Sequence, residues 1–131
     1  MKVIINKCYG GFGLSNKAII EYAKLKGIKL YSEETSLLTT MHYTIPIKEY
    51  KKLYEQDKKK GNWKKSNAFC FSYSDIERND PLLVKVVESL GEEANGRFAE
   101  LKIVEIPDGI KYSIEEYDGM EHIAEEHHTW S

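Results

Sequence analysis

An apolar run, a glycine-rich segment and an amphipathic helix follow one another at the start of this chain and constrain its fold most. The run Val3–Ile5 is not interrupted by polar residues, which is typical of a strand buried on both faces. Residues 15–26 carry apolar side chains at three- and four-residue spacing, as a helix does. Residues 28–31 alternate weakly and are predicted as a second strand, so the chain is expected to start as a β-α-β unit.

The glycine-rich segment, Cys8–Ser15, is a candidate site for an anionic ligand. The first N–H groups of a helix lack partners within the helix and lie at the positive end of its dipole. Glycines let a ligand approach the backbone closely, and an aromatic ring stacks on a base. The alternative interpretation is a tight turn in which Ser15 caps the following helix.

Two arginines, Arg78 and Arg97, flank a helix predicted at 81–90 and would reach the same ligand if that helix packs beside the glycine-rich segment. Arginine binds phosphate through two parallel hydrogen bonds, which makes both residues candidates. The alternative for each is an ordinary surface ion pair. The predicted ligand-binding residues are Tyr9, Gly10, Gly11, Phe12, Gly13, Ser15, Arg78 and Arg97.

The composition is that of one globular domain. The chain has 131 residues, of which 41% are hydrophobic and 31% are charged. We expect a single domain over residues 1–131, with a polar and basic insertion at 33–67 between core elements. No apolar run reaches the length of a membrane span and no signal peptide is recognisable, so a cytoplasmic location is expected.

Catalytic and metal-binding signatures do not stand out. Cys8 and Cys70 lack the spacing of a zinc site or a disulfide framework and are interpreted as small apolar residues. If residues 120–128 formed a helix, His122 and Glu126 would share a face at metal-ligand spacing, but no second ligand set supports such a site. We therefore predict no catalytic residue, metal or cofactor, and expect a binding protein rather than an enzyme.

Charge is distributed unevenly along the chain. Residues 1–65 hold 14 lysines and 6 acidic residues, a net charge of +8, whereas residues 66–131 hold 5 basic and 15 acidic residues, a net charge of −10. Such asymmetry favours either pairing of opposite surfaces within the chain or association between copies, and we predict a homo-oligomer. The net charge of −2 makes a mainly nucleic-acid-binding domain an unlikely class.

The basic residues are concentrated in one segment. Seven lysines fall within residues 51–65 and are interleaved with Tyr50, Tyr54 and Trp63. They lie along and beyond a helix predicted to begin near Ile47 and to fray from Asp57. Such a pattern suits a nucleic-acid backbone or a phosphorylated ligand. The alternative is a solvated helix face and loop.

The second half of the chain reads as one helix and several strands. A strand is predicted at 68–73, and Asp80 as N-cap with proline next predicts a helix over 81–90. Alternating residues at 97–106, 110–117 and 120–125 predict a β-meander. The fold class expected is therefore α+β, with a mixed sheet.

The Asp118-Gly119 pair is the strongest hairpin signal in the chain. A two-residue loop there places Tyr117 opposite Met120, and it places Glu116 opposite Glu121. Like charges directly opposite one another are unfavourable. We expect a nearby cation, a basic partner surface or a different local structure to resolve this repulsion.

Two stretches together carry a family resemblance, Ile5–Ser15 and the region from Asp80 to Trp130, with the strings 91–96, 104–109 and 114–119. They resemble a group of small uncharacterised proteins of tailed bacteriophages and prophages. The resemblance covers roughly half the chain and leaves out the lysine-rich region. It implies an accessory protein in the host cytoplasm that acts on host machinery or defences by binding.

Three functions are consistent with these features. The first is a non-enzymatic binder that captures a small anionic nucleotide-type ligand, such as a host-defence signal, at the glycine-rich segment. The second is an adaptor or inhibitor that contacts a host protein through its acidic C-terminal surface. The third is a nucleotide-processing enzyme, whose active site would be assembled from residues that the sequence does not pair.

Overall fold

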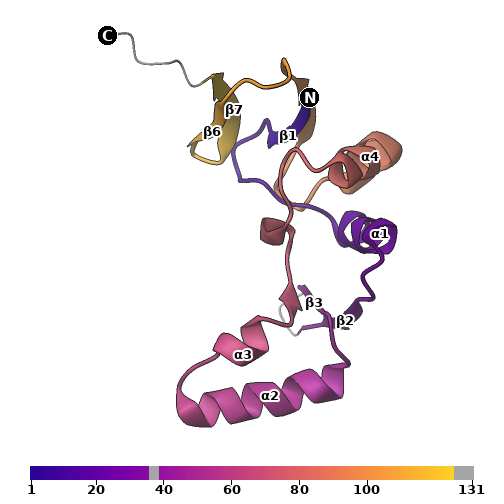
Figure 1. The fold of residues 1–131 in the computed structure, drawn as a ribbon, viewed down its shortest axis with the longest axis vertical. Helices are drawn as coiled ribbons and strands as arrows, with labels where there is room; N and C mark the ends of the chain where they lie inside the picture. Colours follow the sequence, from indigo (N-terminus) through magenta and orange to yellow (C-terminus); the bar gives the residue numbers. More distant parts are fainter. Residues whose placement is uncertain (36–38, 126–131) are drawn as a thin grey trace. The chain divides into compact units, whose positions relative to one another are not determined.

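The computed structural model describes residues 1–35 and 39–125 and has the α+β class that the sequence predicts (Figure 1). The elements in chain order are β1 (Lys2–Asn6), α1 (Asn16–Lys26), β2 (Tyr31–Glu34), β3 (Thr40–Tyr43), α2 (Ile47–Lys60), α3 (Lys64–Asn67), β4 (Cys70–Phe71), η1 (Tyr73–Asp75), α4 (Pro81–Leu90), η2 (Gly91–Ala94), β5 (Leu101–Glu105), β6 (Tyr112–Tyr117) and β7 (Met120–Glu125).

The strands form three antiparallel sheets, so the predicted mixed sheet is wrong in its arrangement. β1 pairs with β5, β3 lies between β2 and β4, and β6 pairs with β7. The predicted β-α-β start is also wrong, because β2 pairs with β3 and not with β1. No three-stranded meander forms at the described C-terminal strands, since β5 pairs far back along the chain. Strand periodicity predicts a strand's faces but not its partner.

The chain divides into two compact units, one made of Met1–Tyr22 with Ile76–Ser131 and the other of Ala23–Asp75. The expectation of one domain with an insertion at 33–67 stays a prediction. The first unit has a net charge of −7, from 8 basic and 15 acidic residues, and the second has +5, from 11 lysines and 6 acidic residues.

Apolar strand residues form the core of the first unit. Val3, Ile4 and Ile5 are buried, which confirms the burial expected of an unbroken apolar run. Helix α4 packs on β1 and β5 and contributes the fully buried Leu83 and Val86. Burial of such side chains contributes about 1.5–3 kcal/mol each relative to exposure.

The edge of β1 that does not face β5 is covered without another strand. The Ile4 N–H donates to the carbonyl of Arg78 (2.9 Å), and the Arg78 Nη1 donates to the carbonyl of Ile4 (3.2 Å). The N–H of Asn6 donates to Glu121 Oε1 (2.8 Å). Side chains and one loop carbonyl thus satisfy backbone groups that a neighbouring strand would otherwise bond.

Helix α4 begins where the sequence predicts. The side chain of Asp80 accepts a hydrogen bond from the N–H of Leu82 (2.9 Å), and Pro81 is the first helical residue. Gly91, at φ 58°, ends the helix. The strong cap signal therefore fixes both the start and the direction of α4.

The β6–β7 hairpin has the register that Asp118-Gly119 predicts. Tyr117 lies opposite Met120, and Glu116 lies opposite Glu121. The expected repulsion is resolved by a cation, because Arg78 binds both carboxylate oxygens of Glu121 at 2.7 and 2.8 Å. The alternative of a helix over 120–128 is wrong for Met120–Glu125, which form a strand, and Glu126 lies outside the described residues.

The second unit contains β2, β3, β4 and two helices. Helix α2 does not fray at Asp57 but continues to Lys60. The strand predicted at 68–73 is reduced to Cys70–Phe71, because the chain turns into η1 two residues later. In the described part of the chain, no helix is long and apolar enough to cross a membrane.

Candidate functional site

Gly10 and Gly13 of the segment Cys8–Ser15 lie against other backbone, whereas a Cβ added to Gly11 would meet nothing within 4 Å. A Cβ added to Gly10 would lie 2.5 Å from the carbonyl oxygen of Phe98. A Cβ on Gly96 would lie 2.6 Å from the carbonyl carbon of Gly13, and the Gly96 N–H donates to the Gly13 carbonyl (3.0 Å). These glycines permit close approach of two chain segments, which is one of the uses of glycine.

Ser15 caps helix α1, as the turn interpretation predicts. Its Oγ accepts from the N–H of Ala18 (3.1 Å) and donates to the carbonyl of Glu93 (2.6 Å). The Ser15 N–H donates to the carbonyl of Ala94 (3.0 Å). The helix start is therefore joined to η2 by hydrogen bonds that an anion would otherwise compete for.

Asn6 connects this segment to the hairpin and to β5. Its buried Nδ2 donates to the carbonyls of Cys8 and Gly119, both at 2.8 Å. Its Oδ1 accepts from the N–H of Glu100 (2.8 Å). One fully buried amide thus ties three parts of the first unit together.

Phe12 lies on an arginine rather than open to a ligand base. The guanidinium of Arg78 stands 3.4 Å from the centre of the Phe12 ring and is paired with the buried carboxylate of Glu121. Arg78 thus has the Phe12 ring against its guanidinium and the Glu121 carboxylate at its two terminal nitrogens.

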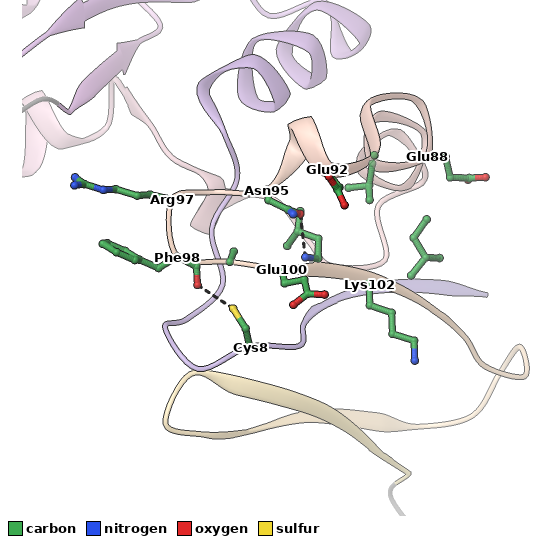
Figure 2. Close-up of a pocket in the computed structure, with 13 residues that line it drawn as sticks. Cys8, Glu88, Glu92, Asn95, Arg97, Phe98, Glu100 and Lys102 are labelled. Atoms are coloured by element: carbon green, nitrogen blue, oxygen red, sulfur yellow. Dashed lines mark hydrogen bonds between the residues drawn. The ribbon is translucent and has the colours of Figure 1, made fainter.

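Beside the glycine-rich segment lies an open pocket of about 900 Å³ between α4, η2 and β5 (Figure 2). Of the predicted ligand-binding residues, Arg97 lines this pocket. Its wall combines apolar strand and helix residues with five charged side chains, which are Glu88, Glu92, Arg97, Glu100 and Lys102.

Phe98 and Arg97 extend together from the turn before β5 (Figure 2). The ring of Phe98 is 66% exposed, and the Arg97 guanidinium stands 5.3 Å from its centre. The carboxylates of Glu92 and Glu100 lie near Asn95 in the middle of the same view. The sequence marked Arg97, whereas Phe98 and Lys102 were missed because only the fold brings them to one pocket.

Cys8 is a free thiol at the edge of this pocket. Its Sγ lies 3.1 Å from the carbonyl oxygen of Phe98 and donates to it (Figure 2). Cys70, the other free cysteine, is half-buried in the second unit. His122 pairs with Glu115 at 3.1 Å on the exposed face of the hairpin. Among the described residues, no group of three or more His, Cys, Asp or Glu is placed to hold a metal.

The second unit has a smaller cleft of about 520 Å³ lined by three tyrosines. Tyr43 and Tyr50 stack with ring centres 4.0 Å apart, and Tyr54 lies 6.2 Å further along α2. Burial raises the pKa of Tyr50 far above its usual range, and burial also lowers the pKa of His42 on β3. Three charged residues, Glu33, Lys51 and Glu55, also line this cleft.

Searches of protein-family models, of curated proteins and of solved structures find no match to this chain.

Proposed function

We propose that this chain is a non-enzymatic binding protein that takes up a small anionic, nucleotide-type ligand in the pocket between α4, η2 and β5. The observation that carries the proposal is an open cavity of about 900 Å³ with an exposed aromatic ring and two cations at its wall. Ligand pockets commonly measure roughly 300–1,000 Å³ and combine apolar lining with a few polar groups.

The residues of the pocket divide by chemistry into three sets. Arg97 and Lys102 supply positive charge at opposite ends of the pocket, and Arg97 is suited to bidentate binding of a phosphate (Figure 2). Phe98 offers a face on which a base stacks. The carboxylates of Glu92 and Glu100 accept hydrogen bonds from amino groups of a base.

Mixed charge in the pocket supports a nucleotide over a simple anion. Three carboxylates stand against two cations, so inorganic phosphate or a polyphosphate gains little net attraction. A nucleotide presents phosphate to one part of the wall and hydrogen-bond donors to another. The glycine-rich segment then serves the site by positioning Cys8 and Phe98 and not by holding the phosphate on its backbone.

A thermal-shift series with cyclic and linear nucleotides tests the proposal. A ligand present at 100 times its dissociation constant stabilises the native state by about 2.7 kcal/mol, which a melting curve detects. Arg97→Gln is expected to weaken binding about tenfold or more through loss of a charged hydrogen bond. Lys85→Gln, an exposed change of the same charge on α4, is the matched control and keeps full affinity.

Two results would contradict the proposal. One is the absence of any shift with the whole panel. The other is an equal loss of affinity in Arg97→Gln and Lys85→Gln, which would indicate a general charge effect. Turnover of a bound nucleotide would instead show that the pocket is an enzyme site.

The adaptor function is the second candidate, and exposed tyrosines favour it. Tyr117 is 76% exposed at the hairpin tip and Tyr9 is 62% exposed in the glycine-rich segment. Glu115, Glu116 and Asp118, also exposed, surround Tyr117 in sequence. Tyrosine is enriched in protein interfaces, so this acidic tip suits a basic protein partner.

The bacteriophage context stays a prediction, and the two candidates are separable without it. If nucleotides bind, Tyr117→Ser leaves their affinity unchanged because Tyr117 does not line the pocket. If the adaptor function holds, Tyr117→Ser abolishes a complex recovered from host extract while Tyr73→Ser, in the other unit, keeps it.

A further inference from the structure

The lysine-rich segment of the second unit is folded into a compact turn between two helices. Helix α2 ends at Lys60, Gly61 adopts φ 66°, and α3 begins at Lys64 (Figure 1). Residues 58–65, called the basic turn below, contain five lysines and no acidic residue. The sequence suggested a fraying end, whereas the structure holds these lysines on a defined backbone.

A buried carboxylate holds the basic turn in place. The Oδ2 of Asp57 accepts from the N–H of Ser66 (2.7 Å), and the Asn62 N–H donates to the Asp57 carbonyl (3.1 Å). The Asn62 Oδ1 accepts from the N–H of Lys64 (3.0 Å). Three hydrogen bonds therefore fold α3 back against α2 and fix where the lysines lie.

The hydrogen bonds from Ser66 lower the pKa of Asp57, and the charges of Lys65 and Lys60 act in the same direction. Asp57 itself is 3% exposed, so its carboxylate lies beneath the turn and not among the lysine side chains at the surface. The outer surface of the turn is accordingly positive.

Aromatic rings accompany the lysines at this surface. All five lysines of the basic turn are exposed. Trp63 lies in the sequence between the pairs Lys59-Lys60 and Lys64-Lys65 and is 39% exposed. Tyr54 on α2 is also 39% exposed. On the helix, Lys48, Lys52 and Lys59 recur at four- and seven-residue spacing, which places them on one face, and that face also carries the exposed Glu55.

We propose that the basic turn and the adjoining face of α2 bind the backbone of single-stranded nucleic acid. Lysines neutralise phosphates and release condensed counterions, which supplies sequence-independent affinity. The exposed ring of Trp63 favours single-stranded over double-stranded nucleic acid, because only an unpaired strand offers base faces for stacking. This surface lies in a unit of net charge +5, and salt of about 0.1 M screens charges more than roughly 10 Å away, so the overall charge of −2 does little to oppose binding here.

Fluorescence anisotropy with a labelled oligothymidylate of about 16 nucleotides measures this binding. If five lysines each neutralise one phosphate, log K falls against log salt with a slope of about −3.5. No binding at about 50 mM salt, where such contacts are strong, overturns the proposal.

A matched pair of charge variants locates the site. Lys59→Gln with Lys64→Gln removes two phosphate contacts and is expected to reduce the magnitude of the slope by about 1.4. Lys85→Gln with Lys111→Gln removes the same charge from exposed positions of the other unit and keeps the slope. Equal effects of the two pairs overturn the assignment to the basic turn.

Trp63→Ala separates stacking from charge. Loss of one stacked base is expected to weaken binding by about five- to a hundredfold while the salt slope stays unchanged. Circular dichroism checks that α2 remains folded. Unchanged affinity in a folded Trp63→Ala overturns the single-strand proposal, as does an excess of duplex DNA that competes as well as the single strand.

The predicted homo-oligomer is the rival use of these lysines, and light scattering distinguishes it. If Lys59→Gln with Lys64→Gln dissociates an oligomer and leaves oligonucleotide binding unchanged, the lysines contact the acidic surface of a second copy and the proposal fails. If the wild-type protein has the same mass at low and high salt and still binds the oligonucleotide, the proposal is supported.

Discussion

The glycine-rich segment Cys8–Ser15 and the basic turn 58–65 look alike in the sequence, since each joins two elements and each is rich in one kind of residue. In the structure they differ in where those residues lie. The glycines pack against Phe98 and Gly119, whereas the lysines remain exposed over a turn held from beneath by Asp57.

This difference shows that an enriched residue type predicts a binding loop only where those residues remain exposed and are not packed against other parts of the protein. Glycine is required both where a ligand approaches and where another backbone does, so its presence does not distinguish the two uses. Lysine is almost never fully buried without a partner, so a run of lysines predicts a surface in either case. The ring neighbours differ likewise, since Phe12 covers Arg78 while Trp63 is partly exposed.

The largest expected effect comes from the ion pair beneath the glycine-rich segment. Glu121→Gln leaves the guanidinium of Arg78 without its carboxylate and is expected to cost about 3–5 kcal/mol of unfolding free energy. Urea unfolding measures the loss. Glu115→Gln, an exposed change on the neighbouring strand, is the control and should lie within about 0.5 kcal/mol of wild type. Equal stabilities would mean that this segment is not packed as described.

Two turn glycines test how much close contact with other backbone adds to the cost of replacing glycine with alanine. Gly119 and Gly109 have similar φ angles, 88° and 81°, so alanine at either strains the backbone by about 1–2 kcal/mol. Only at Gly119 would the new Cβ meet backbone, 2.7 Å from the Gly10 nitrogen, whereas nothing lies within 4 Å at Gly109. Gly119→Ala is therefore expected to cost about 1–3 kcal/mol more than Gly109→Ala in the same unfolding assay.

A pair of phenylalanines tests whether Phe12 is a structural or a ligand residue. Each has an arginine near its ring, Arg78 at 3.4 Å from Phe12 and Arg97 at 5.3 Å from Phe98. Phe12→Leu should lower stability by about 1–2 kcal/mol by removing a desolvated cation–π contact. Phe98→Leu should leave stability within about 0.5 kcal/mol but weaken nucleotide affinity. The reverse result, in which Phe12→Leu weakens nucleotide affinity and Phe98→Leu lowers stability, would indicate that the ligand binds at the glycine-rich segment.

The smallest effect concerns the carboxylate beneath the basic turn. Because the folded pKa of Asp57 is lowered, its stabilisation is fully present above about pH 4 and is lost as pH falls through the folded pKa. Asp57→Asn should lower the melting temperature by a few degrees at pH 7, with α2 helicity reduced.

The difference in melting temperature between Asp57→Asn and wild type should narrow as pH falls below about 4, and it should be smallest below the lowered folded pKa of Asp57, where both side chains are neutral. Glu55→Gln, exposed on the same helix, is the control and should show no such convergence. If the difference in melting temperature stayed constant across pH, the charge of Asp57 would not contribute. The effect of Asp57→Asn would then come from the shape of the amide alone.

Local signals predicted the fold where they act between neighbours in sequence. Asp80 and Pro81 fixed the start of α4, and Asp118-Gly119 fixed the register of β6 with β7, because caps and two-residue turns involve adjacent residues. The opposed Glu116 and Glu121 indicated that a cation, a basic partner surface or a different local structure had to offset their repulsion. That the cation is Arg78 was beyond the sequence, because it comes from a loop 43 residues away.

Partners of strands and walls of pockets were not predictable in this way. Ile4 pairs with Ile103, and no local pattern distinguishes that partner from a nearer strand. Arg78 and Arg97 were expected to reach one ligand, yet the first is bound to Glu121 and the second lines the pocket. Identical side chains take different roles once burial and neighbours are fixed, and those depend on the whole fold.

The covered edge of β1 has a consequence for how the chain is made. Arg78 and Glu121, which complete that edge, follow their β1 partners by 74 and 115 residues. At roughly 5–20 residues per second, ribosomes need about 6–23 seconds to supply the last of them. Until β5 is made, the most apolar strand of the nascent chain has two open edges, and the second edge is not complete until Glu121 follows. The second unit, whose strands pair locally, can already fold during this interval. Slow translation or heat during synthesis should therefore lower the soluble yield of this protein more than the stability of the folded protein would suggest.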